Sequence, residues 1–195
     1  IDINADNDQD ITLIALEEIV FSGEGGDDHI SLVGWDTTDT ASIGLTSISV
    51  DGGSGDDTLL GSADADTLSG GAGDDVISGG TGDDSIDGGA DNDQVTQSVD
   101  SDQTLTDSSL TGEGTDTLAD VEQADLTGGD SANNLDASAF TRGSVTLAGG
   151  AGADTLAGGT GNDSLDGGAD DLGADNAVGG VDDNADTNWV DLVIQ

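Results

Sequence analysis

The stretch GGSGDDTLLGSADADTLSGGAGDDVISGGTGDDSIDGGADNDQVT, residues 52–96, repeats one unit of nine residues five times without interruption. Aligned, the units follow the pattern Gly-Gly-x-Gly-x-Asp-x-apolar-x. The sixth place always holds an aspartate: Asp57, Asp66, Asp75, Asp84 and Asp93. The eighth place always holds an apolar residue: Leu59, Leu68, Ile77, Ile86 and Val95. A fixed period with these residues in constant places is typical of a parallel β-helix.

Each unit is expected to form a turn followed by a short strand. Glycine tolerates positive φ, so the first places of the unit can turn tightly and direct several backbone carbonyls toward one point. The aspartate that ends the turn adds a carboxylate. Oxygen donors of these two kinds, without imidazole or thiolate, suit Ca²⁺. In the strand that follows, alternation directs only the eighth-place residue inward.

The repeat resembles the RTX (repeats-in-toxin) family, whose haemolysin-type nonapeptides form a calcium-binding β-roll. The resemblance implies an all-β, right-handed parallel β-roll, or β-helix solenoid, in which two units make one coil and several Ca²⁺ ions lie between stacked GGxGxD turns. Partner turns then lie eighteen residues apart, which pairs Asp57 with Asp75, Asp66 with Asp84, and Asp75 with Asp93. The resemblance also implies that backbone carbonyls of the same turns complete each site, and the candidate glycines are Gly53, Gly55, Gly71, Gly73, Gly80, Gly82 and Gly89.

The nine-residue register extends upstream with departures from the pattern. Two upstream units keep an aspartate in the sixth place, Asp28 and Asp39, and both are weaker candidate ligands because their partners are damaged or displaced. A third unit, residues 43–51, has Ile48 in that place and is expected to be poor in metal. We therefore predict a first roll block over residues 23–96.

Downstream, residues 97–110 lose both the glycines and the period, so we predict an irregular connector there. The period resumes in a second, more degenerate roll block over residues 111–175. This block supplies three further candidate ligands: Asp116, Asp154 and Asp163.

Both ends of the chain contain apolar segments, Ile11 to Phe21 and Trp189 to Ile194. Because terminal units of solenoids are normally atypical caps, we predict cap or strand regions at residues 1–22 and 176–195. The alternative is that these segments form a contact surface, which would give calcium-dependent end-to-end self-association.

The chain of 195 residues carries 43 acidic residues and one basic residue, Arg142, for a formal net charge of −42. This charge argues against nucleic acid and anionic membrane surfaces as partners. Such acidity is also typical of disordered chains, but here the acids occupy set places in a repeat with apolar partners. Adaptation to high salt is an alternative that the sequence leaves open. No run is long and apolar enough for membrane insertion.

A second acidic pattern lies near the N-terminus. Asp6, Asp8, Asp10 and Glu17 occupy positions 1, 3, 5 and 12 of an EF-hand loop. Ile11 stands where that loop needs glycine, and no amphipathic helices flank it. We therefore expect an acidic N-terminal stretch rather than a metal site.

Groups suited to catalysis are scarce. His29 is the only histidine and falls in an outward place of its unit, and the chain has no cysteine, tyrosine or lysine. Nothing resembles a Ser-His-Asp arrangement or a zinc site. Paired carboxylates for glycoside hydrolysis need a cleft, which a roll surface does not obviously offer. We therefore expect no enzymatic activity.

Two functional hypotheses follow. Calcium is scarce in the cytosol and plentiful outside the cell, and the RTX resemblance implies a secreted or cell-surface bacterial protein that leaves by type I secretion and folds on meeting calcium. The first hypothesis is a structural or interaction segment of an adhesin, surface layer or fibre. The second is the non-catalytic module of a secreted protease, lipase, epimerase or toxin. Ice binding is weaker, because the outward seventh-place residues form no regular threonine array.

Overall fold

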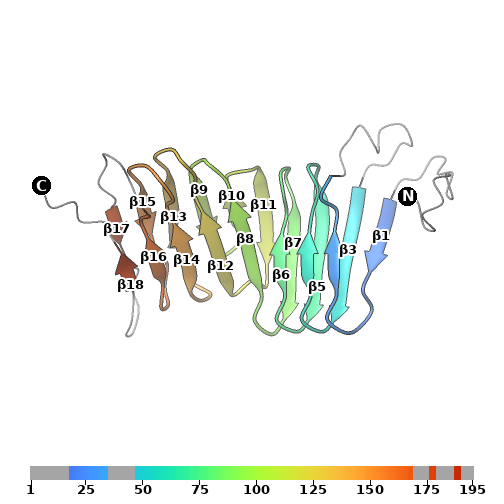
Figure 1. Cartoon of the computed structure of the whole chain (residues 1–195). Coiled ribbons are helices and arrows are strands. Elements are labelled where there is room, and N and C mark those ends of the chain that lie inside the picture. Colours follow the sequence, from blue (N-terminus) through green and yellow to red (C-terminus); the bar gives the residue numbers. More distant parts are fainter. Residues whose placement is uncertain (1–17, 35–46, 169–175, 179–186, 190–195) are drawn as a thin grey trace, which may run out of the picture.

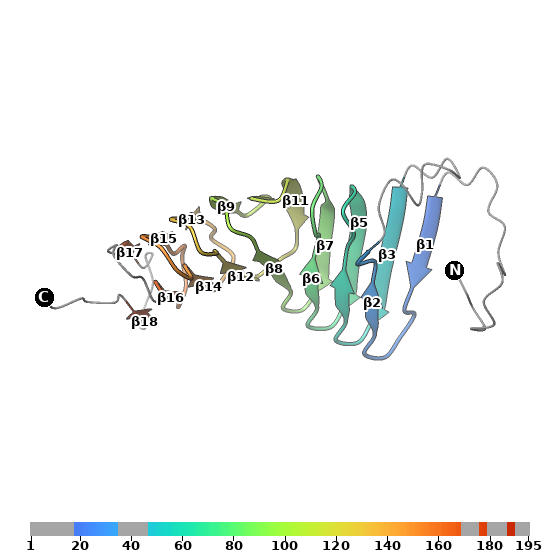
Figure 2. The same ribbon diagram turned by 45° about the horizontal axis from the view of Figure 1, so that its top comes forward.

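The structure, a computed structural model, describes residues 18–34, 47–168, 176–178 and 187–189. Within these residues the secondary structure is β-strand, and no helix there is long and apolar enough to cross a membrane. The strands form two sheets, and the chain winds between them from β1 at one end to β17 and β18 at the other (Figure 1). A view turned by 45° shows the same succession of strands along the length of an elongated solenoid (Figure 2).

In spatial order, the ten-stranded sheet consists of β1 (Glu18–Ser22), β3 (Ser47–Ser54), β5 (Asp66–Ala72), β7 (Ser85–Ala90), β11 (Thr115–Ala119), β10 (Ser109–Thr111), β9 (Gln103–Thr106), β13 (Asn134–Ala139), β15 (Thr155–Ala157) and β17 (Asn176–Val178). The eight-stranded sheet consists of β18 (Thr187–Trp189), β16 (Ser164–Asp166), β14 (Val145–Ala148), β12 (Gln123–Thr127), β8 (Gln94–Ser98), β6 (Val76–Ser78), β4 (Thr58–Leu60) and β2 (His29–Ser31). Neighbouring strands run parallel, except that β10 is antiparallel to both β9 and β11.

Strand pairing in the first block follows the eighteen-residue spacing. Leu59 in β4 lies opposite Ile77 in β6, and Leu68 in β5 lies opposite Ile86 in β7. Two successive units therefore make one coil, with one strand in each sheet. The prediction of an all-β parallel roll is confirmed.

The interior is a stack of the eighth-place residues. Leu59, Leu68 and Ile77 are completely buried, and Ile86 and Val95 are 1% exposed. Burying an aliphatic side chain of this size contributes about 1.5–3 kcal/mol. The stack continues through the second block with four more completely buried leucines: Leu135, Leu147, Leu156 and Leu165. Hydrophobic burial thus runs along the whole described roll.

The glycines of the second and fourth places allow the coils to stack closely. Gly71 and Gly73 have φ of 113° and 129°, which other residues rarely adopt. A methyl group on Gly71 would also collide with the carbonyl oxygen of Gly53 in the preceding coil. The glycine pattern therefore reflects both the turn conformation and the distance between coils.

The start of the first block differs from the predicted register. β2 pairs directly with β4, with His29 opposite Thr58, so the unit at 23–31 stacks on the unit at 52–60. The unit expected at 34–42, with Asp39, lies almost wholly outside the described residues, as do the EF-hand-like acids. Val50 of the next unit is buried in β3, as predicted for the eighth place, and Ile48 in the sixth place is buried as well.

Residues 97–110, for which the sequence predicted an irregular connector, contain β9 and most of β10. Leu105 and Leu110 lie opposite each other in this antiparallel pair and are 0% and 1% exposed. β9 then pairs in parallel with β13, so the ten-stranded sheet continues into the second block. The two repeat blocks therefore belong to one solenoid.

Two buried amides accompany this hairpin. Gln97 Nε2 donates to Gln103 Oε1 at 3.1 Å, and Gln103 Nε2 donates to the carbonyl oxygen of Thr127 at 2.7 Å. Both side chains are buried, at 7% and 0% exposure. Because buried polar groups are costly unless they are paired, these bonds fix how the hairpin meets the roll.

The inward register shifts by two residues at β12. Ala124 lies opposite Val95 of the first block, but Leu126 lies opposite both Gln97 in β8 and Leu147 in β14. The eighth-place residues of the first block therefore align with Ala124, whereas those of the second block align with Leu126. The nine-residue registers of the two blocks differ by two residues at this strand.

Candidate metal sites in the stacked turns

The sixth-place residues of the first block, together with Asp116 at the start of the second, form two rows, one along each edge of the roll. The first row leads into the eight-stranded sheet and contains Asp28, Asp57, Asp75 and Asp93. The second row leads into the ten-stranded sheet and contains Ile48, Asp66, Asp84 and Asp116. Except for Asp28, which is partly buried, these aspartates are at most 4% exposed.

Each row is held by one repeated hydrogen bond. The backbone N–H of Asp57 donates to Asp75 Oδ1 at 2.7 Å, and that of Asp75 donates to Asp93 Oδ1 at 2.9 Å. In the second row, the N–H of Asp66 donates to Asp84 Oδ1 at 2.8 Å. The structure thus brings together all three pairs expected at a spacing of eighteen residues.

Two further pairs are brought together at other spacings. The N–H of Asp28 donates to Asp57 Oδ1 at 2.7 Å across 29 residues. The N–H of Asp84 donates to Asp116 Oδ1 at 3.0 Å across 32 residues, because β11 pairs directly with β7 while β9 and β10 lie beyond β11 in the sheet. Insertions in the chain therefore leave both rows intact.

The second block pairs its aspartates differently. Asp154 Oδ1 accepts the N–H of Asn133 at 2.8 Å, and Asp163 Oδ1 accepts the N–H of Val145 at 2.9 Å. Asp154 and Asp163 are both 1% exposed. The same backbone bond persists, but the stacked partner toward the N-terminus offers an amide or an isopropyl group instead of a carboxylate.

The second carboxylate oxygen of the first-block aspartates is buried and accepts no hydrogen bond. These atoms are Oδ2 of Asp28, Asp57, Asp75, Asp84 and Asp93. Asp66 differs, because its Oδ2 accepts both the N–H and the hydroxyl of Ser62 while its Oδ1 is the buried atom without a donor. A buried carboxylate oxygen without a donor is costly and requires an explanation such as a bound ion.

These oxygens face a space lined by other oxygens. A methyl group on Gly52 would collide with Asp57 Oδ2 and lie 2.6 Å from the carbonyl oxygen of Gly70. A methyl group on Gly70 would likewise collide with Asp75 Oδ2 and lie 2.6 Å from the carbonyl oxygen of Gly88. The space beside the first glycine of these two turns thus meets a carboxylate from its own coil and a carbonyl from the next.

Within the described residues, no three Asp, Glu or His side chains converge on one point. A metal ion in these turns would therefore be held by carboxylate and backbone carbonyl oxygen together, which is the donor set that Ca²⁺ prefers. The seven candidate glycines have positive φ, between 91° and 129°. The carbonyl of Gly53 faces Gly71, and that of Gly71 faces Gly89, so these carbonyls stack along the roll.

Burial disfavours the charged form of these carboxyls in the metal-free fold. It raises the pKa of Asp84 to about 7 and that of Asp93 to about 6, and like charges in the neighbouring coils add to the effect. Burial also raises the pKa of Asp66, Asp75 and Asp116. A divalent cation among these oxygens would reverse that preference.

Sequence reasoning missed Glu122. Its Oε2 accepts the backbone N–H of Asp93 at 3.2 Å, which is the bond that an aspartate makes elsewhere in the first row. The pairing of Gln123 with Gln94 places Glu122 in line with Asp93, so Glu122 is the last carboxylate of the first row. Its turn lacks the glycines of the repeat. The only feature of the sequence that could have indicated Glu122 is its position two residues before Ala124, which faces inward as an eighth-place residue does.

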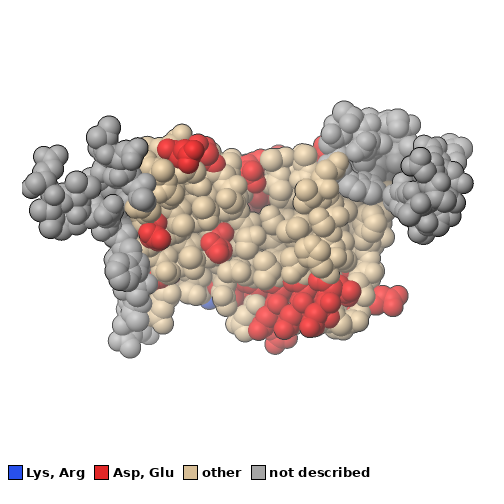
Figure 3. Space-filling model, in the orientation of Figure 1, with Lys and Arg blue, Asp and Glu red and all other residues tan. Residues whose placement is uncertain are grey.

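The fifth-place acids form an outer ladder that was also missed. Asp56, Asp74 and Asp83 occupy the fifth place and are exposed. However, the N–H of Asp74 donates to Asp56 Oδ1, and that of Asn92 donates to Asp74 Oδ1, both at 3.0 Å. Acidic side chains gather along this edge of the molecule (Figure 3). His29 is exposed at the start of β2.

Comparison with known proteins agrees with this geometry. The sequence matches the family model described as RTX calcium-binding nonapeptide repeat, in 4 copies, over residues 51–86, 69–96 and 146–171. A comparison with curated proteins found no match. The matched segments contain the central aspartates of both rows, together with Asp154 and Asp163.

Proposed function

We propose that this RTX-repeat protein is an extracellular structural or interaction segment, of the adhesin, surface-layer or fibre type, that folds when it binds Ca²⁺ after secretion. The RTX repeats that it carries bind calcium as a class. The observation that carries the proposal is the stacking of buried carboxylates whose second oxygen has no hydrogen-bond donor, as in Asp57, Asp75 and Asp93.

The energetics favour coupling between folding and calcium. Adjacent strands in a sheet lie about 4.8 Å apart, and two like charges at such a distance repel by about 1 kcal/mol even in water. Several stacked pairs in partly buried turns then offset much of a domain stability of about 5–15 kcal/mol. When bound, Ca²⁺ supplies the positive charge that these oxygens lack, so its binding energy becomes folding energy.

Circular dichroism tests this proposal directly. The intact chain in EDTA should show little β signal, and millimolar calcium should restore it cooperatively. Magnesium should act poorly, because it resists dehydration and requires a tighter octahedron. Equal spectra with EDTA and with calcium would refute the coupling.

We also propose that the chain has no catalytic role. Two grooves along the described roll have volumes of about 280 and 290 Å³. The first contains one carboxylate, Asp125, and the second contains one, Glu113. Carboxylate-based hydrolysis uses a pair of acids, so neither groove offers that arrangement. Assays of the calcium-loaded chain against ester, peptide and glycoside substrates would reveal an activity that contradicts this view.

The alternative is a non-catalytic module that aids export and folding of an attached enzyme or toxin domain. Continuity of both sheets through the two repeat blocks supports a structural segment, since the roll extends well beyond the five regular units. Mass spectrometry of the mature native protein decides between them. A catalytic domain joined to this chain would favour the module.

End-to-end association in calcium forms a further part of the proposal. The ends of a solenoid present strand edges that pair with other strands unless they are covered, and a head-to-tail contact that does not close produces fibres. Light scattering with and without calcium should show assemblies that depend on residues 189–195. A monomer in millimolar calcium at high protein concentration would refute this part.

A further inference from the structure

Arg142, the only basic residue of the chain, lies where the first row of carboxylates ends. Glu122 is the last member of that row. A methyl group on Gly143 would collide with the backbone carbonyl oxygen of Glu122, so the next turn packs directly against it. That turn, residues 140–145 (FTRGSV), contributes no acid. A metal ion placed there would have no carboxylate from the following coil.

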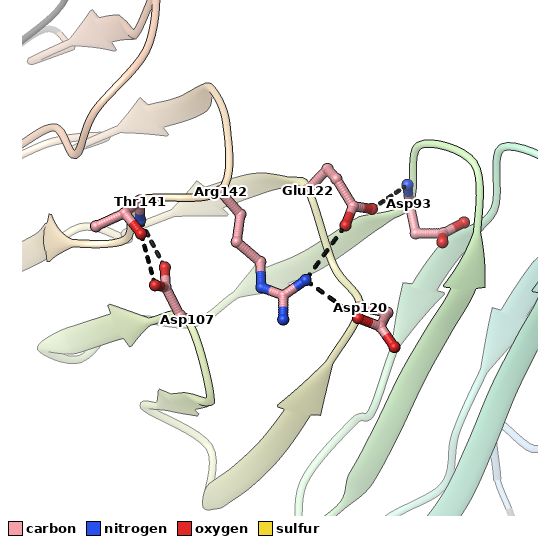
Figure 4. A network of polar contacts seen from close by, with 6 residues as sticks. All are labelled: Asp93, Asp107, Asp120, Glu122, Thr141 and Arg142. Carbon is pink, nitrogen blue, oxygen red and sulfur yellow. Dashed lines mark hydrogen bonds and ion pairs between the residues drawn. The ribbon is translucent and has the colours of Figure 1, made fainter.

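The guanidinium of Arg142 instead forms ion pairs with the acids of this turn (Figure 4). Its Nη1 lies 3.2 Å from Asp120 Oδ1 and 3.5 Å from Glu122 Oε1. The other oxygen of Glu122 accepts the N–H of Asp93. The side chain of Glu122 therefore joins the first row on one side to a positive charge on the other.

The loop that carries Arg142 is anchored from the hairpin. Thr141 donates its N–H to Asp107 Oδ1 and its hydroxyl to Asp107 Oδ2, both at 2.6 Å. Asp107 lies in the turn between β9 and β10. The hydrogen bonds from Thr141, with a smaller contribution from the charge of Arg142, lower the pKa of Asp107, so this anchor is ionised at neutral pH. The anchor reduces the entropy lost when the guanidinium is held in place.

We propose that Arg142 is an internal cation that terminates the first row, taking at the Glu122 turn the part that Ca²⁺ takes between the turns of the first block. This inference rests on the proposed function, because it assigns calcium to the other turns. An exposed ion pair usually contributes little. Here the pair contains the only basic residue of a chain with 43 acids. Removing Arg142 leaves the charges of Asp120 and Glu122 uncompensated.

Hydrogen exchange measured by mass spectrometry in saturating calcium tests the proposal. Arg142→Gln should make the amides of residues 121–123 exchange about tenfold faster, as expected when a local opening is favoured. Thr67→Glu adds the same negative charge on the outward face of β5 and is the matched control. It should leave these amides unchanged.

Charge removal should rescue the variant. Adding Asp120→Asn and Glu122→Gln to Arg142→Gln should restore protection, because no repulsion remains. If Arg142→Gln does not fold in calcium, the triple variant should still fold and protect these amides, since it carries no uncompensated acid there, and a triple variant that also fails would overturn the inference. Wild-type protection in Arg142→Gln, or equal loss in Thr67→Glu, would overturn the inference. These outcomes leave the calcium-induced folding of the wild-type chain as a separate test of the proposed function.

Discussion

The regular first block and the junction around β9 to β12 use the same two sheets but different means of holding the coils together. In the first block, buried carboxylates such as Asp57 and Asp75 stack in pairs with oxygens left for a metal. At the junction, an antiparallel hairpin, two paired amides and an arginine take their place. The apolar stack and the charge compensation are therefore separable parts of this fold.

The largest effect expected from this contrast concerns pH in the absence of calcium. Burial raises the pKa of Asp84 from 3.8 to about 7, so its charged form destabilises the metal-free fold. The cost is absent below pH 4, grows as pH rises toward 7 and is then constant, on the order of 4 kcal/mol. In EDTA the β signal should therefore be stronger at pH 5 than at pH 8.

Asp84→Asn should reduce this pH dependence in circular dichroism, because it removes the buried titrating group. Asp56→Asn, in the exposed fifth place, should reduce it much less. Equal signals at pH 5 and pH 8 in EDTA would show that burial of these carboxyls does not control the metal-free fold.

The apolar stack should respond alike in both regions. Ile77 in the first block and Leu105 in the hairpin are both completely buried. Replacing either one by alanine should cost roughly 2–5 kcal/mol. Urea unfolding in saturating calcium measures this. A loss confined to Ile77→Ala would mean that the hairpin is not part of the same core.

The paired amides should matter only at the junction. Gln103→Leu removes the acceptor of Gln97 Nε2 and the donor to the Thr127 carbonyl. Gln97 Nε2 still donates to the carbonyl oxygen of Thr111, and the carbonyl oxygen of Thr127 still accepts the N–H of Val99. The expected cost is therefore that of two lost hydrogen bonds at about 0.5–1.5 kcal/mol each. Urea unfolding in saturating calcium should show this loss of unfolding free energy. The calcium concentration at the folding midpoint should change only by the amount that this lost stability accounts for. A stabilised variant would contradict the role assigned to the amides.

The smallest expected effect is the difference in calcium midpoint between substitutions of sixth-place and fifth-place acids. Asp75→Asn should raise the calcium midpoint about tenfold, or about 1.4 kcal/mol, because Asp75 is shared by two stacked pairs. Asp56→Asn retains an oxygen that can accept the N–H of Asp74 and removes only exposed charge. It should leave the midpoint unchanged or lower it. A calcium titration that gives equal shifts would contradict the assigned register.

The sequence predicts those carboxylate pairs whose spacing is visible within consecutive repeat units. The pairs of Asp57, Asp75 and Asp93 follow from a period that is visible in the units themselves. The pairing of Asp28 with Asp57 does not, because the length of an insertion says nothing about which coils meet across it. Glu122 was missed because its turn has neither the glycines nor the length of a repeat unit.

The hairpin was missed for a different reason. Residues 103–111 hold only two apolar residues, Leu105 and Leu110, and no glycine. Only the neighbouring strands decide whether such a segment pairs in an antiparallel or a parallel manner. The shift of two residues at β12 likewise arises from contacts with β8 and β14 rather than from any residue within β12.

The repeated bond from the N–H of a sixth-place aspartate to the carboxylate of the following coil gives the roll a polarity. Every coil offers a donor toward the C-terminal side and an acceptor toward the N-terminal side. A stack cut between two coils therefore exposes two chemically different faces, one that presents hydrogen-bond donors and one that presents acceptors. Copies of such a stack are complementary only when they point the same way, so a lengthened roll or a filament made of these coils must be unidirectional.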